Sequence, residues 1–351
     1  MTANIKPSAQ QIRQARADNP KMRERDLAAQ MNISEADLVA AYVGDSVRRI
    51  EPRVGEILKG LEALGEVMAL TRNDSAVHEK IGIYDKVVLG DHASMVLSEN
   101  IDLRIFPNVW KHGFAVEKRD GDDVRRSLQF FDKAGEAVHK VHLRPASNVE
   151  AYEALVESLL SDDQSQTVET QPIEKKTRTE ARADARDELR NRWSAMTDVH
   201  QFFGMLRELK LDRKDAVGMV GDEYAWPLDT SSVAAMFDQA VEQEVPIMCF
   251  VGNHGCIQIH SGPVKTVKPM GPWINIMDPT FHLHLRNDHV SELWAVRKPT
   301  KDGIVTSIEA YDTAGELFIQ FFGTRHEGEA ERDDWRSLVE SLPRVSRQYA
   351  A

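Results

Sequence analysis

The sequence predicts an α+β protein built by tandem duplication, in which each half consists of helices, a large antiparallel β-sheet and a closing helix. Two observations support this prediction. Helical periodicity over residues 8–60 gives way to short β-branched runs separated by turns, and the same succession returns later in the chain. Matched motifs also recur at one constant spacing, for example Asp132-x-Ala134-Gly135-Glu136 and Asp312-x-Ala314-Gly315-Glu316.

The composition bounds the class of protein. Of the 351 residues, 42% are hydrophobic and 28% are charged, as in ordinary soluble globular proteins. The net charge of −12 argues against a protein that coats nucleic acid or an anionic membrane. The sequence shows neither a secretion signal pattern nor an apolar run of membrane-spanning length, so we expect a cytoplasmic protein. Two cysteines, Cys249 and Cys256, are too few for a disulfide framework.

The first repeat is expected to occupy residues 1–162. Its helical start contains Ser34 and Asp37 at the spacing of a capping box. An antiparallel meander is predicted for residues 67–143, followed by a closing helix at about 149–160.

Residues 163–192 predict a charged connection, first a polar linker and then a solvated helix with charges of both signs. The second repeat then occupies residues 193–351 and is expected to carry the ligand site.

Residues 27–39 superficially resemble a helix-turn-helix, which would make the chain a DNA-binding regulator. The second helix of this pair begins with Glu35 and Asp37, and carboxylates that face phosphates weaken DNA binding. A plain helical hairpin is the alternative interpretation.

Two strands that match between the repeats, residues 101–105 and 281–285, differ in their polar residues. Alternation places Asp102 and Arg104 on one face of the first strand, as an ion pair or with Arg104 directed into a pocket. In the second strand it places His282 and His284 on one face. Two neutral imidazoles could hold a divalent ion in a mononuclear metal-dependent enzyme, or they could simply be half-buried sheet residues.

Residues 197–203 predict a helix start with one histidine beside two phenylalanines. Asp198 and Gln201 have capping-box spacing, which places His200 in the first turn. There the helix dipole disfavours the imidazolium form, so the ring would keep a lone pair for a metal. The alternative is a buried histidine packed beside Phe202 and Phe203.

Three basic residues lie near aromatic residues in the second half: Arg213, Lys298 and Arg325. Each alone is most simply a surface cation. Together with one neutral histidine and abundant apolar rings, they suit a flat apolar ligand with carboxylate tails.

Several runs together resemble the bacterial cytoplasmic haemin-transport and haem-degrading factors of the HemS/ChuS type. The matching runs are Asp-Val-His-Gln-Phe-Phe at 198–203, Asp-Leu-Arg-Ile-Phe at 102–106, Val-Arg-Lys-Pro at 296–299 with Asp-Gly-Ile-Val-Thr-Ser at 302–307, and Phe-Gly-Thr-Arg at 322–325. The similarity covers nearly the whole chain, including the duplication.

The resemblance implies a haem site with His200 as axial ligand to the iron. It implies that Arg104 reaches over the opposite face with Phe106 beside it, and that Arg213, Lys298 and Arg325 meet the propionates. It also implies two functions between which the sequence does not choose. As a carrier, the protein would take haem from an uptake transporter. As an enzyme, it would open the porphyrin ring with O2 and an electron donor.

Overall fold

The computed structural model describes residues 6–174, 185–326 and 328–345, and the chain divides into two compact units. Unit 1 comprises Met1–Arg72, Glu79–Glu174 and Gly252–Gln258. Unit 2 comprises Asn73–His78, Lys175–Val251 and Ile259–Ala351. One short segment of each repeat therefore belongs to the unit built mainly from the other repeat.

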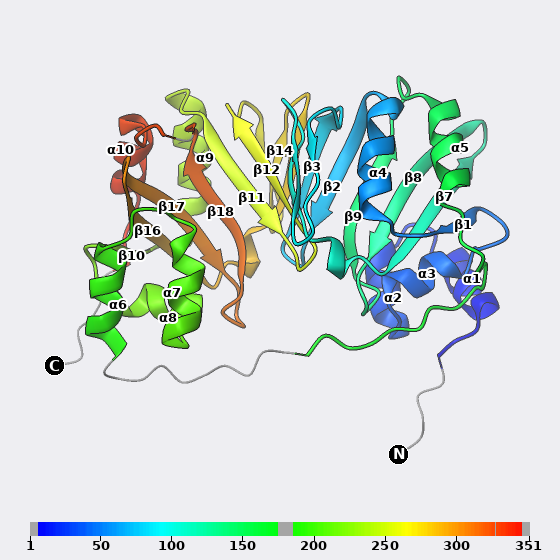
Figure 1. Cartoon of the computed structure of the whole chain (residues 1–351), viewed down its shortest axis with the longest axis horizontal. Coiled ribbons are helices and arrows are strands. Elements are labelled where there is room, and N and C mark those ends of the chain that lie inside the picture. The colour runs from blue at the N-terminus through cyan, green and yellow to red at the C-terminus, as the bar shows by residue number, and fades with distance from the viewer. Residues whose placement is uncertain (1–5, 175–184, 327, 346–351) are drawn as a thin grey trace, which may run out of the picture. The chain divides into compact units, whose positions relative to one another are not determined.

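Unit 1 begins with three short helices and ends with a closing helix, as predicted (Figure 1). Its helices are α1 (Ala9–Asp18), α2 (Glu24–Met31), α3 (Glu35–Ala40), α4 (Val54–Leu61) and α5 (Val149–Ser158), with short 3-10 turns at Glu62–Leu64 and Pro107–Val109. Its strands are β1 (Val47–Ile50), β2 (Val67–Arg72), β4 (Val87–Val88), β5 (Ser94–Leu97), β6 (Asp102–Ile105), β7 (His112–Asp120), β8 (Asp123–Phe131) and β9 (Ala137–Leu143), and β3 (Ala76–Gly82) is divided between the two units.

Unit 2 repeats this order of elements. Its helices are α6 (Ala185–Ser194), α7 (Gln201–Leu209), α8 (Arg213–Met219), α9 (Ser232–Glu242) and α10 (Asp333–Ser341), with a 3-10 turn at Asn287–His289. Its strands are β10 (Ala225–Leu228), β11 (Ile247–Gly252), β13 (Val267–Met270), β14 (Trp273–Met277), β15 (Phe281–Arg286), β16 (Glu292–Thr300), β17 (Gly303–Tyr311) and β18 (Leu317–Gly323), and β12 (Cys256–Gly262) is divided between the units.

The strand order confirms the duplication. In unit 1 the order is β1-β7-β8-β9-β2-β3, and in unit 2 it is β10-β16-β17-β18-β11-β12. Each unit also holds a smaller antiparallel group, β6-β5-β4 in unit 1 and β15-β14-β13 in unit 2. The pairings are antiparallel from β1 to β2 in unit 1, from β10 to β11 in unit 2 and within both smaller groups, so the predicted α+β class and the two large antiparallel sheets are confirmed.

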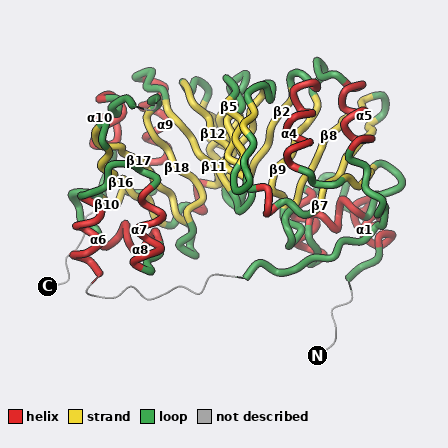
Figure 2. Tube along the Cα trace, viewed as in Figure 1, coloured by secondary structure: helices red, strands yellow, loops and turns green. Residues whose placement is uncertain are grey.

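Both faces of the main strands are covered by helices. In unit 2, Leu293 and Ala295 of β16 belong to the core under α9 and α10, whereas Trp294 and Val296 belong to the core under α6, α7 and α8. Figure 2 shows α6, α7 and α8 as one group of helices, and α4 and α5 side by side in unit 1. Because side chains alternate along a strand, a strand covered on both faces needs apolar residues in continuous runs.

The helix-turn-helix interpretation does not fit the structure. Every residue of α3 is buried, Glu35 and Asp37 included, because this helix packs on β1 and β7. A recognition helix needs a free face to enter a groove. The predicted capping box is present, since Ser34 Oγ accepts from the Asp37 N–H and the Asp37 carboxylate accepts from the Ser34 N–H.

Three local predictions need correction. Residues 8–60 are not wholly helical, because β1 lies among them. The described part of the predicted solvated helix is α6, and its Leu189 and Trp193 are fully buried in unit 2. The polar linker packs on unit 1 through the buried Val168, while residues 175–184 of the predicted connection lie outside the described residues. The domain boundaries at 162 and 192 remain predictions.

Over residues 6–174, 185–326 and 328–345, no helix is both long enough and apolar enough to cross a membrane.

Candidate functional site

His200 lies at the start of α7, and its side chain is 90% exposed. The buried alternative is therefore wrong. The helix begins two residues later than predicted, at Gln201, so His200 is its N-cap residue in place of Asp198. A turn precedes it, in which the Gln201 N–H donates to the Asp198 carbonyl at 3.1 Å and the Phe202 N–H donates to the Val199 carbonyl at 3.2 Å. This turn holds the imidazole at the surface.

Asp198 binds both the backbone and the ring of His200. Its Oδ1 accepts the His200 N–H at 2.8 Å and lies 2.7 Å from the ring Nδ1. These hydrogen bonds, the backbone one first, lower the pKa of Asp198. Gln201 closes the turn from the other side, because its Oε1 accepts from the N–H groups of Thr197 and Asp198. The reciprocal half of the predicted capping box is thus present, whereas the Asp198 side chain bonds His200.

Two phenylalanines that follow His200 have different surroundings. Phe203 is 66% exposed, and Phe202 is buried edge-to-face against Trp193 with ring centroids 4.9 Å apart. Two cations lie over the Phe202 ring, with Lys298 Nζ 4.6 Å and Arg213 Cζ 5.2 Å from its centroid. The exposed histidine is therefore followed in the first turn of α7 by one exposed ring, Phe203, and by one buried ring, Phe202, over which the two cations lie.

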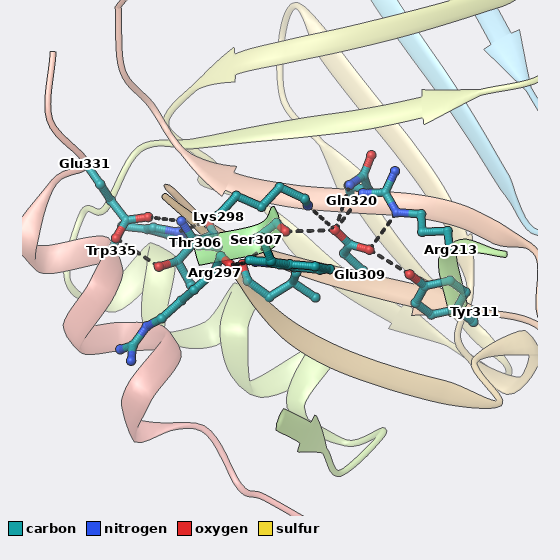
Figure 3. A network of polar contacts seen from close by, with 12 residues as sticks. Arg213, Arg297, Lys298, Thr306, Ser307, Glu309, Tyr311, Gln320, Glu331 and Trp335 are labelled. Carbon is teal, nitrogen blue, oxygen red and sulfur yellow. Dashed lines mark hydrogen bonds and ion pairs between the residues drawn. The ribbon is translucent and has the colours of Figure 1, made fainter. Parts of the chain in front are cut away.

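Arg213 and Lys298 share one carboxylate, that of Glu309 on β17 (Figure 3). Arg213 donates through Nε at 2.9 Å and Nη2 at 2.6 Å, and Lys298 donates through Nζ at 3.0 Å. Lys298 lies within β16. The Glu309 side chain is fully buried, so the attraction between these charges is screened less than in a surface pair, while their burial also carries a desolvation cost.

Three neutral side chains complete the Glu309 network, which we define as Glu309 with Arg213, Lys298, Ser307, Tyr311 and Gln320. The Tyr311 hydroxyl donates to Glu309 Oε2 at 2.7 Å, the Ser307 hydroxyl to Oε1 at 3.0 Å, and the Gln320 amide to Oε1 at 3.2 Å. Gln320 stands opposite Glu309 in the register of β17 and β18. The carboxylate therefore receives donors from three strands and from α8.

Burial and charge act against each other in this network. Burial alone would raise the pKa of Glu309, but attraction to Arg213 and Lys298 outweighs it and lowers the pKa. Burial lowers the pKa of Lys298 to about 8, with Glu309 opposing that shift and Arg213 adding to it. At neutral pH the network holds two cations and one carboxylate, so one positive charge is in excess.

The matching positions of the first repeat have different chemistry. Ser127 matches Ser307, but Gln129 and Phe131 stand where the second repeat has Glu309 and Tyr311. The Gln129 amide donates to Ser127 Oγ at 3.1 Å. The buried carboxylate is thus a feature of the second repeat.

Arg104 and Phe106 belong to unit 1 and are half-buried. Arg104 forms an ion pair with Asp102 and donates to the Leu103 carbonyl at 3.1 Å, so the predicted pairing on one strand face is confirmed. The Phe106 N–H donates to the Gly255 carbonyl at 3.0 Å. This carbonyl also accepts from the Trp110 indole at 3.1 Å, which fixes the turn after β6.

Arg325 follows β18 in unit 2 and is half-buried. Its Nη1 lies 3.4 Å from the Glu329 carbonyl, which is a long hydrogen bond, so its guanidinium is held less firmly than that of Arg213.

The strand with two histidines shows the predicted alternation, with Phe281 and Leu283 buried and His282 and His284 half-buried. His284 Nδ1 lies 2.6 Å from Asn275 Oδ1 on the neighbouring strand. Within the described ranges, His, Cys, Asp and Glu side chains nowhere gather in groups of three that could hold a metal ion. The geometry thus gives the non-haem metal site no support.

Sequence reasoning missed Glu309, Tyr311, Ser307 and Gln320. One signal was present, because Glu309 lies between Ile308 and Ala310 and all the other residues of the strand Gly303–Tyr311 are uncharged. An acid in such a place must be paired. The packing of Trp193 against Phe202 was also not predicted, because Trp193 follows a run of charged residues.

Comparison with known proteins places the chain in a family. The sequence matches the family described as "Haemin-degrading HemS.ChuX domain" twice, over residues 32–159 and 210–342. The hemin transport protein HemS of Yersinia enterocolitica is 39% identical over 338 residues, which cover 95% of this chain and 96% of that protein.

Two solved structures are similar over nearly their whole length. Holo-PhuS, a heme-binding protein from Pseudomonas aeruginosa, has a TM-score of 0.92 and 43% identity, covering 96% of this chain and 98% of that chain. ChuS, described as an E. coli heme oxygenase, has a TM-score of 0.85 and 38% identity, covering 93% and 98%. The two matched segments and this full-length similarity agree with the duplicated fold, and the chain belongs to the haemin-degrading HemS/ChuX-domain family.

Proposed function

We propose that this protein binds haem and that His200 is the axial ligand of the iron. One observation carries the proposal: an exposed imidazole at the start of α7 whose Nδ1 is bonded to Asp198. When Nδ1–H donates to the carboxylate, the lone pair lies on Nε2, which is the atom that can bind a metal. The exposed Phe203 ring, in the first turn of the same helix, offers an apolar surface to a porphyrin.

The excess positive charge of the Glu309 network supports a carboxylate ligand. Arg213 and Lys298 are largely buried and share Glu309, so a second negative charge would balance them. A haem propionate supplies such a charge, and its oxygens accept charge-assisted hydrogen bonds. We assign the propionates to Arg213 and Lys298, and to Arg325.

Arg104 and Phe106 are assigned to the opposite face of the haem. This part of the proposal rests on the resemblance of residues 102–106 to the family, since His200 belongs to unit 2 and Arg104 to unit 1. A guanidinium does not bind iron strongly, so the sixth position would stay exchangeable. Such a site suits both transfer of haem and the binding of O2.

The cellular role we propose is to accept imported haem in the cytoplasm and pass it on, with a haem-uptake transporter as donor. This role is favoured by the relative named for hemin transport. Oxidative opening of the porphyrin ring, which releases iron, is the second candidate, favoured by the similar structure described as a heme oxygenase. That reaction needs O2 and an electron donor, and the haem itself supplies the oxygen chemistry.

Titration with haemin tests the proposal. The parent protein should give the Soret band of a histidine-ligated haem, and His200→Ala should lose or shift it. The control is His92→Ala, which removes an exposed histidine of unit 1 and should leave the spectrum unchanged. A parent-like spectrum from His200→Ala would refute the assigned ligand.

Adding a reductant in air, with catalase present, separates the two roles. An enzyme would convert the bound haem to a linear tetrapyrrole and release iron. Intact haem after many minutes would support the carrier and contradict the enzyme.

A further inference from the structure

Asp198 contacts His200 twice through one carboxylate oxygen. The same oxygen accepts the backbone N–H of His200 at 2.8 Å and faces its ring Nδ1 at 2.7 Å. Because the carboxylate is fixed to the backbone beside the ring, it fixes the orientation of the ring as well. Nδ1 faces the turn, and most of the ring remains exposed.

The turn that holds Asp198 is itself anchored. The Asp198 N–H donates to Gln201 Oε1 at 3.3 Å, and the Asp198 carbonyl accepts from the Gln201 N–H at 3.1 Å. The Lys301 N–H donates to the Thr197 carbonyl at 2.9 Å, which ties the turn to the loop between β16 and β17. These three hydrogen bonds fix the backbone that carries the Asp198 side chain, so we expect the carboxylate to keep its place when the ring binds a metal.

We propose that Asp198 is a positioning residue that sets the electron donation of His200 to haem iron. The inference rests on the proposed function, since it takes His200 as the ligand. A carboxylate that accepts Nδ1–H gives the ring partial imidazolate character and makes Nε2 a stronger donor. A stronger axial donor stabilises ferric over ferrous iron, which lowers the reduction potential.

This arrangement suits a protein that receives haem in the ferric state. The site would bind ferric haem more tightly than ferrous haem, so reduction of the iron would weaken binding. Asp198 would thereby couple the oxidation state of the iron to how tightly the haem is held. A simple N-cap carboxylate would have no such effect.

The test is Asp198→Asn, which keeps an oxygen for the His200 N–H but removes the negative charge. With haem bound, the reduction potential should become more positive and the ferrous iron–histidine stretching frequency should fall. The affinity for ferric haem should fall by about tenfold or more, as is usual when a metal-bound histidine loses its carboxylate partner.

The matched control is Asp229→Asn. Asp229 has the same local geometry, because its Oδ1 accepts from the N–H of Ser231, two residues on, at 2.9 Å and from its hydroxyl at 2.6 Å. It contacts no imidazole through these bonds, so potential and stretching frequency should stay at the parent values. Unchanged values in Asp198→Asn as well would overturn the inference.

A second measurement uses the haem-free protein, so it tests the proposal even when Asp198→Asn does not bind haem. Nitrogen NMR of labelled histidines, with His200 assigned through His200→Ala, reports which ring nitrogen carries the proton. The parent should show Nδ1–H, and Asp198→Asn should shift the population toward Nε2–H. The same tautomer in both proteins would refute the role of Asp198, whereas failure of the proposed function shows as a parent-like haem spectrum from His200→Ala.

Discussion

At the scale of single residues, the polar interior of unit 2 depends on Glu309. This carboxylate is fully buried and accepts from two cations and three neutral donors. Burial of two cations without a partner would cost several kcal/mol, so the network is stable only while Glu309 is ionised. The aromatic ring under both cations, that of Phe202, is held in place by the same contacts.

Glu309→Gln should lower the free energy of unfolding by about 3–5 kcal/mol, because it leaves two buried cations without a counter-charge. Urea unfolding at neutral pH measures this loss. Glu292→Gln is the control, since Glu292 pairs with Lys214 at 2.5 Å but is 38% exposed. The control should cost about 1 kcal/mol or less. Equal costs for the two variants would contradict the account of the network.

At the scale of elements, the two repeats use the same turn before their last strand. Asp132 Oδ1 accepts from the N–H groups of Ala134 and Glu136, and Asp312 Oδ1 accepts from those of Ala314 and Glu316. Gly135 has φ of +78° and Gly315 has φ of +80°, a region that a Cβ disfavours. The surroundings differ, because Gly135 packs against the N-cap residue of α3, Ser34.

Gly135→Ala should therefore destabilise the protein more than Gly315→Ala. Both carry the strain of positive φ, about 1–2 kcal/mol. At Gly135 the new methyl group would also overlap Ser34, whereas at Gly315 its nearest neighbour is Cδ of the flexible Lys214 side chain, at 3.0 Å. Urea unfolding of the two variants measures the difference. If the two variants lose the same free energy of unfolding, the contact between Gly135 and Ser34 at the start of α3 does not contribute to the difference.

At the scale of the whole molecule, much of the fold follows from the sequence. The constant spacing of motifs predicts two similar folding units, and alternation predicts the faces of β6 and β15. The capping box at Ser34 predicts the start of α3, because the Ser34 hydroxyl accepts the backbone N–H three residues further on when the chain enters a helix at that point.

Other features depend on contacts that no local pattern contains. The membership of Asn73–His78 in unit 2 is set by tertiary packing. Burial of Leu189 and Trp193 in α6 was masked by the charges that surround them, since two apolar residues one turn apart give little periodicity. For the candidate site, His200 was predicted from its place in an expected helix start and from the family resemblance. The Glu309 network joins side chains from α8, β16, β17 and β18, and no local pattern brings these together.

The pH dependence of stability is a property of the whole molecule, and we expect His139 of unit 1 to contribute to it. Its Nδ1 lies 2.9 Å from Thr71 Oγ1 and its Nε2 lies 2.7 Å from the Tyr84 hydroxyl. Burial lowers the pKa of His139 to about 3, with His142 adding to the shift. Below the unfolded pKa of 6.5, the unfolded chain takes up a proton that the folded protein refuses, so this share of stability is lost as pH falls from 6.5 toward 3.

Between pH 7 and pH 5 this residue should cost the parent about 2 kcal/mol of unfolding free energy. Glutamine does not titrate, so between these pH values the free energy of unfolding of His139→Gln should fall by about 2 kcal/mol less than that of the parent. Urea unfolding at both pH values measures this difference. His92→Gln, at an exposed position, should follow the parent. A parent-like loss in His139→Gln would contradict a neutral buried His139.

The crystal structure of the full chain loaded with haemin tests the central claim most directly. The account predicts that the iron is bound by Nε2 of His200, with Nδ1 still on the Asp198 carboxylate and a propionate at Lys298 or Arg213. Iron bound by another side chain, or by His200 through Nδ1, would contradict it.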